Sequence, residues 1–115
     1  MIAQKFIAAI SGLVGNRLYP LTLPDKPTYP AIRYSMVSVT EEPFVDHNKV
    51  ILRYRVNFDV YAKTYAQAFE LRGQIQDAIR AIPEFIEQGV DFDGFETETK
   101  LFTWTLDFSF RDQTN

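Results

Sequence analysis

The stretch "VILRYRVNFDVYAK", residues 50–63, alternates between apolar side chains and a mixed polar set. The apolar positions are Val50, Leu52, Tyr54, Val56, Phe58 and Val60. The positions between them are Ile51, Arg53, Arg55, Asn57, Asp59 and Tyr61. A two-residue period rich in β-branched and aromatic side chains predicts a strand with one face on a core. What the opposite, polar face of that strand contacts is the question on which a functional interpretation depends.

Two further segments follow the same pattern. Residues 31–41, "AIRYSMVSVTE", predict a strand that pairs with residues 49–62 as an antiparallel hairpin, because a proline and an Asp-His-Asn turn lie between them. Residues 101–112, "LFTWTLDFSFRD", alternate without exception. They predict another strand with one apolar and one polar face.

Helical spacing appears in two other places. Residues 2–14 predict a short amphipathic helix that ends in a left-handed cap at Gly15 and Asn16. A second helix is expected from the capping pair Thr64 and Gln67 to Pro83, with apolar side chains at a 3.6-residue period.

The remaining segments are expected to be irregular. Residues 17–30 hold four of the six prolines and predict an extended lead-in. Residues 84–100 are acidic and interrupted by glycines, and they predict a solvated loop.

Together these elements predict one α+β domain over residues 1–115. Its sheet is expected to be mainly antiparallel, or mixed, with three or four strands and two helices packed on one face. The other face of the sheet is left polar and open.

Composition excludes several classes of protein. The chain has no cysteine, which excludes disulfides, thiolate metal sites and a cysteine nucleophile. It has no apolar run near the ~20 residues of a membrane span. Its net charge of −3 argues against broad nucleic-acid binding. Residues 1–80 carry ten basic and seven acidic side chains, whereas residues 81–115 carry two basic and eight acidic ones. Such a distribution of charge suits a molecule in which one side of each copy attracts the opposite side of another copy. It is equally compatible with chance.

We find no signature of an enzyme. His47, the only histidine, lies in the predicted hairpin turn without an orienting partner. Asp91, Asp93, Glu96 and Glu98 do not fall at the spacing of a calcium loop. The sequence therefore predicts no catalytic, cofactor-binding or metal-ligating residue.

The polar strand face leaves three interpretations open. Arg53 and Arg55 could contact a phosphate backbone, but the aromatic side chains that sheet-type RNA binders use fall on the apolar side here. The face could simply be solvated. It could also be a protein–protein surface, because interfaces favour arginine and tyrosine.

Two blocks resemble a known family. "GNRLYPLTLPDKPTYPAIRY", residues 15–34, and "VNFDVYAKTYAQAFELRGQIQDAI", residues 56–79, are similar to the small tail-completion (tail terminator) proteins of long-tailed bacteriophages. The matching positions are Gly15, Arg17, Leu18, Tyr19, Pro30, Ile32, Tyr34, Val56, Asp59, Val60, Tyr61, Ala62, Ala68, Leu71, Ile75 and Ile79. The resemblance covers roughly residues 10–111, but residues 84–100 match nothing recognisable.

The resemblance implies a structural virion protein, assembled in the bacterial cytoplasm. Such proteins form a ring, typically of six copies, at the head-proximal end of the tail. There they stop growth of the tail tube and join the tail to the head. The implied partners are further copies of the chain, the tail-tube protein and the head-completion or connector protein. DNA would pass through the ring without sequence-specific contacts, and no membrane or cofactor would be involved.

The candidate subunit contacts are Arg53, Arg55, Asp107 and Arg111, all on polar strand faces. Two other readings stay open. The chain could be a head-completion or tail-tube component of the same virion, or a non-viral α+β module that binds a ligand or RNA.

Overall fold

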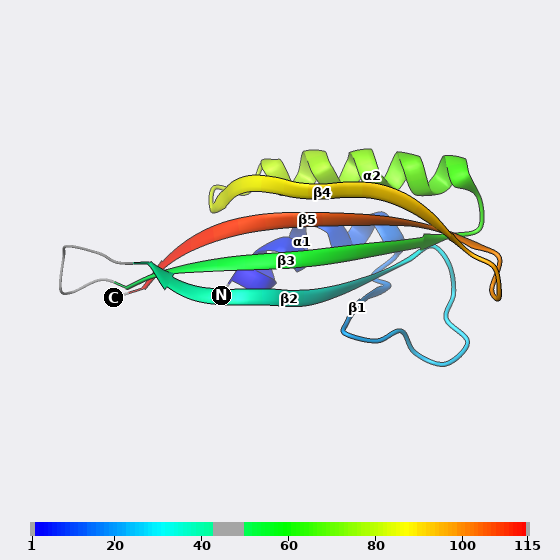
Figure 1. The fold of residues 1–115 in the computed structure, drawn as a ribbon, viewed down its shortest axis with the longest axis horizontal. Helices are drawn as coiled ribbons and strands as arrows, with labels where there is room; N and C mark the ends of the chain where they lie inside the picture. The colour runs from blue at the N-terminus through cyan, green and yellow to red at the C-terminus, as the bar shows by residue number, and fades with distance from the viewer. Residues whose placement is uncertain (1, 43–49, 115) are drawn as a thin grey trace.

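The computed structural model describes residues 2–42 and 50–114, which form a five-stranded sheet with its helices on one face (Figure 1). The strand order is β1-β2-β3-β5-β4; β1 and β2 are parallel, and the other neighbouring pairs are antiparallel. The helices are α1 (Ile2–Ile10), the 3₁₀ helix η1 (Ser11–Val14) and α2 (Tyr65–Arg80). The strands are β1 (Leu18–Pro20), β2 (Ala31–Glu42), β3 (Val50–Ala62), β4 (Phe85–Glu96) and β5 (Leu101–Thr114). The predicted α+β class is confirmed.

The alternating segment of residues 50–62 forms β3, the central strand. It pairs antiparallel with β2 on one side and with β5 on the other. Val56, Phe58 and Val60 are fully buried under the helices, whereas Arg55 on the other face is exposed. The predicted hairpin of residues 31–41 with 49–62 is thus confirmed for the residues from Val50 onward, with a bulge in β2 between Met36 and Ser38.

Both predicted helix ends are confirmed. Gly15 has the left-handed φ of 57° expected of a cap, and the Asn16 amide donates to the Ser11 carbonyl at 2.8 Å. At the start of α2, the Thr64 hydroxyl accepts a hydrogen bond from the Gln67 amide at 3.2 Å. The helix ends at Arg80, shortly before Pro83.

The prediction of a loop for residues 84–100 is wrong. Residues 85–96 form the edge strand β4, paired with β5. The register slips between Gln88 and Asp91, so polar and apolar positions do not alternate continuously along the strand. The proline-rich lead-in also contributes a strand, the short β1 at the other edge, where Pro20 does not interrupt a central ladder. These two edge strands raise the predicted three or four strands to five.

Aromatic rings fill the core between sheet and helices. Phe6 of α1 packs edge-on against Phe58 of β3 at 5.3 Å and lies 6.1 Å from Phe110 of β5. Phe58 in turn lies 5.8 Å from Phe108. All four rings are fully buried, so α1 is fixed to this face of the sheet.

Candidate interaction surface

The open face of the sheet carries charges that pair across neighbouring strands. The Arg33 guanidinium on β2 donates to Asp59 on β3 at 2.8 Å, and the Thr105 hydroxyl on β5 donates to the other oxygen of Asp59 at 2.9 Å. The hydrogen bond to Asp59 raises the pKa of Arg33. The same guanidinium lies 5.7 Å from the centre of the Tyr61 ring, which is itself almost buried.

A second pair lies nearer the middle of the face. Arg55 Nε donates to Asp107 Oδ2 at 2.6 Å, and this bond raises the pKa of Arg55. The Asp107 side chain is only 3% exposed whereas that of Arg55 is half exposed, so the guanidinium covers the carboxylate. Asp107 Oδ1 is buried and finds no hydrogen-bond partner within the described part of the chain. Gly89 of β4 lies so close that a Cβ there would be 3.0 Å from Asp107 Oδ2.

Arg53 of β3 lies two residues from Arg55 on the same face of the sheet, and Arg111 lies beside it on β5. They face each other directly in the β3–β5 register, and like charges in that position repel. An ion pair between Arg53 and Glu87 of β4 offsets part of that repulsion. Arg111 is exposed, and its backbone amide donates to the Glu84 carbonyl at 2.8 Å.

A groove of about 380 Å³ brings three of the four candidate residues together. Its lining is polar and comprises Ser38, Thr40, Arg53, Arg55, Glu87, Gln88, Gly89, Asp107 and Ser109. Arg111 is outside this lining but directly opposite Arg53 in the register. Because Arg53 and Arg55 are paired with Glu87 and Asp107, the groove presents alternating charges rather than the positive stripe that a phosphate backbone attracts.

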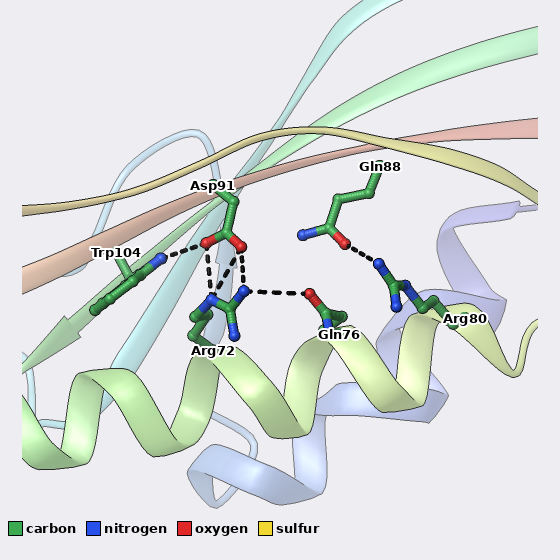
Figure 2. Close-up of polar contacts among 6 residues, drawn as sticks. All are labelled: Arg72, Gln76, Arg80, Gln88, Asp91 and Trp104. Carbon is green, nitrogen blue, oxygen red and sulfur yellow. Dashed lines mark hydrogen bonds and ion pairs between the residues drawn. The ribbon is translucent and has the colours of Figure 1, made fainter.

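A different polar cluster, on the helix side of the sheet, ties β4 to α2 (Figure 2). Both carboxylate oxygens of Asp91 accept from Arg72 Nε at 2.9 Å, and Trp104 Nε1 donates to Asp91 at 2.5 Å. About two turns further along α2, Arg80 donates to Gln88 at 2.8 Å. The hydrogen bond from Arg72, followed by that from Trp104, lowers the pKa of Asp91.

Sequence reasoning missed this cluster, although a signal was present. Arg72 falls in the apolar stripe of α2, where an unpaired charge would be costly. A carboxylate partner from another element was therefore required, and Asp91 is that partner.

The acidic residues of the β4 region are engaged separately. Asp93 accepts from the Tyr65 hydroxyl at 2.9 Å, and Glu96 accepts from Thr99 at 3.0 Å. Across residues 2–42 and 50–114, no three His, Cys, Asp or Glu side chains are grouped so that they could hold a metal ion. None of the helices in those ranges is both long enough and apolar enough to cross a membrane. His47 lies outside the residues that the structure describes.

Comparison with known proteins adds two findings. The family described as "Tail completion protein gp17" matches residues 4–112. Among solved structures, a chain of the "Virion of native gene transfer agent (GTA) particle" has a similar fold, with a TM-score of 0.60 and 15% sequence identity. The alignment covers 93% of this chain and 86% of that one. No curated protein matches the sequence.

Proposed function

This chain belongs to the family of the tail completion protein gp17, and from that membership we propose that it forms a closed ring that terminates a phage tail tube and joins the tail to the head. The observation that carries the proposal is the match over residues 4–112, nearly the whole chain. The similarity in fold to a chain of a virion particle supports a structural role of this kind. The proposed ring has six copies and sits at the head-proximal end of the tail. The role is assembly rather than catalysis.

The distribution of charge supports a head-to-tail ring. A ring requires two different patches on each copy that fit each other. Residues 17–33, around β1 and the start of β2, carry three basic and one acidic side chain. Residues 85–100, which form β4 and the turn after it, carry five acidic side chains and one basic one. β1 and β4 are the opposite edges of the sheet. One edge region is therefore mainly basic and the other mainly acidic, and the two can meet in adjacent copies.

The open-face groove provides the proposed subunit contacts. Arg53 and Arg55 present guanidinium groups in the groove, and Asp107 holds Arg55 in place through their ion pair. Arg111 lies outside the groove, opposite Arg53 in the register. Arginine is enriched at interfaces because its planar group makes several hydrogen bonds while its stem packs on apolar surface.

One experiment tests the function as a whole. In the virus that encodes this chain, the gene is disabled and the lysate is examined by electron microscopy. The proposal predicts filled heads separated from tails, with tails of irregular length. Adding the purified protein should restore joined particles. Joined, infectious particles of normal tail length without the protein would overturn the proposal. Filled heads without tails, or with abnormal tail tubes, would instead assign the chain to the tube.

A second experiment tests the groove. The variant Arg53→Gln removes one guanidinium from the groove, and Lys63→Gln is the matched control, because Lys63 is an exposed cation outside the groove. We expect the first variant to stay folded but to lose most of the assembled species in sedimentation, and the control to assemble normally. Equal assembly of both variants would remove Arg53 from the interface. Charge reversal at Arg55 is unsuitable, since a glutamate there would face the buried Asp107 and test folding instead.

A further inference from the structure

An exposed row of aromatic rings runs across the β4–β5–α2 corner of the molecule. Phe95 lies 4.9 Å from Phe102, Phe102 lies 5.9 Å from Tyr65, Tyr65 lies 5.8 Å from Trp104, and Trp104 lies 5.5 Å from Phe69. Tyr65, Phe69 and Phe95 are 47%, 53% and 51% exposed. Phe102 is partly buried and Trp104 is only 8% exposed, and these two rings join the three half-exposed rings into one cluster. A patch of exposed aromatic side chains of this kind is typical of a protein-binding surface. We call these five residues the aromatic row.

The rim of the aromatic row is charged. Asp93, which accepts a hydrogen bond from Tyr65, lies on β4 beside it, whereas Glu96 interacts with Arg33 and Tyr61 of the open face. Arg72 closes the other end, with its guanidinium 5.8 Å from the centres of both the Phe69 and Trp104 rings. A partner of this surface therefore needs apolar groups for the rings and a cation for the acidic side of the rim.

The opposite edge of the sheet carries a segment with those properties. Residues 20–30, which we call the proline arm, hold four prolines, one lysine and one aspartate, Asp25, and they project from the body of the molecule after β1 (Figure 1). Leu21 in the arm is 68% exposed, and Lys26 is also exposed.

Both ends of the proline arm are held by hydrogen bonds. The Leu21 amide donates to the Tyr34 carbonyl at 2.8 Å, and Arg17 Nε donates to the Pro30 carbonyl at 2.9 Å. Restraint at both ends lowers the conformational entropy that the arm would lose on binding. A proline-rich segment lacks the amides needed to extend a β ladder, but it packs well between aromatic rings.

The arm and the aromatic row lie at the same level along the strands. The arm ends where β2 begins, and Ala31 of β2 is in register with Tyr61 of β3. The next residue, Ala62, is in register with Phe102, which is paired with Phe95. A ring is generated by rotation without a shift along its axis, so patches that meet must lie at equal height. With the strands near parallel to the ring axis, the arm of one copy reaches the aromatic row of its neighbour.

We propose that the proline arm of one copy lies on the aromatic row of the next copy, with Leu21 and the prolines against the rings and Lys26 beside Asp93. The inference rests on the proposed ring and names the contact that would propagate it. The two surfaces lie on opposite edges of one sheet, so within this arrangement each copy gives one arm and receives another.

Cross-linking between two single-cysteine variants tests this contact directly, because the chain has no cysteine of its own. Thr22→Cys labels the arm and Thr97→Cys labels the turn beside Phe95, and both positions are exposed. The two variants are purified separately, mixed and treated with a short thiol-reactive cross-linker. We expect the mixed dimer in several-fold excess over the product of a control mixture, Thr22→Cys with Gln4→Cys on the exposed side of α1. A mixed product no more abundant than the control would overturn the inference.

Two further readouts separate this inference from the ring itself. The variant with both cysteines, Thr22→Cys and Thr97→Cys, should give a ladder of products that ends at the size of the ring. Leu21→Ser and Phe95→Ser should each reduce assembly in sedimentation without loss of the folded subunit. If the unmodified chain forms a ring but the arm and row positions do not cross-link, the contact is wrong and the ring stands. If there is neither a ring nor a cross-link, both proposals fall.

Discussion

Replacing Gly89 by alanine should destabilise the subunit, because an added Cβ would lie against the buried Asp107 at a distance tighter than an ordinary van der Waals contact. An added Cβ would lie 3.0 Å from Asp107 Oδ2, 3.2 Å from its Cγ and 3.5 Å from its Cβ. Two atoms of one side chain, Oδ2 and Cγ, are crowded at once, so a rotation of the carboxylate alone does not relieve the contact. Asp107 is also held by Arg55 and is almost completely buried.

The magnitude follows from two opposing terms. Overpacking of this kind costs about 1–3 kcal/mol in unfolding free energy. Replacing glycine by alanine also reduces the conformational entropy of the unfolded chain, which stabilises the folded subunit by about 0.4–1 kcal/mol. We therefore expect a net loss of about 1–2 kcal/mol. With a denaturant slope of about 1–3 kcal/mol/M for a domain of this size, the urea midpoint should fall by roughly 0.5–1 M.

The assay is urea unfolding at neutral pH, followed by the fluorescence of Trp104, the single tryptophan. Gly73→Ala is the matched control, because a Cβ at Gly73 in α2 would meet nothing within 4 Å. Alanine in a helix is favoured over glycine by about 0.5–1 kcal/mol, so this variant should be more stable than the unmodified chain. A Gly89→Ala variant as stable as the unmodified chain would refute the close packing of β4 on Asp107.

Three other changes have expected outcomes. The pKa of Asp91 is lowered by Arg72 and that of Glu84 is lowered by Lys5, so the unfolded chain takes up protons first as the pH falls. Stability should therefore be greatest above about pH 5 and decline through about pH 4 and below, and Asp91→Asn should flatten this decline in urea titrations across that range. Thr64→Ala removes the cap of α2 and should cost about 1 kcal/mol, measured as a lower urea midpoint, whereas an unchanged midpoint would show that the cap is dispensable. Phe58→Ala empties a fully buried site between Phe6 and Phe108 and should cost about 3–5 kcal/mol in the same assay, a loss below about 1 kcal/mol being incompatible with the packed core.

The parts of the fold that follow local physical rules could be predicted from the sequence. The strict alternation of β3 and β5 identified both strands and the face of each that is buried. Gly15 and Thr64 marked helix boundaries because capping depends on the residues next to the cap. β4 escaped prediction because its alternation breaks between Gln88 and Asp91, where the register slips. A short edge strand such as β1 owes its pairing to β2 and carries little pattern of its own.

The candidate surface could be predicted only as a set of side chains on one face. Alternation placed Arg53, Arg55, Asp107 and Arg111 on the polar sides of β3 and β5, and register then brought them close together. Neither the burial of Asp107 nor its contact with Gly89 follows from sequence, because both depend on the approach of β4. The aromatic row was invisible for a similar reason, since it joins rings from three separate elements.

The mass of the purified protein in solution, measured by light scattering over a range of concentrations, tests the proposed ring most directly. We predict one closed assembly of several copies, whose mass stops increasing once it has formed. A subunit that remains single at every concentration, or a dimer that recruits no further copies, would contradict it.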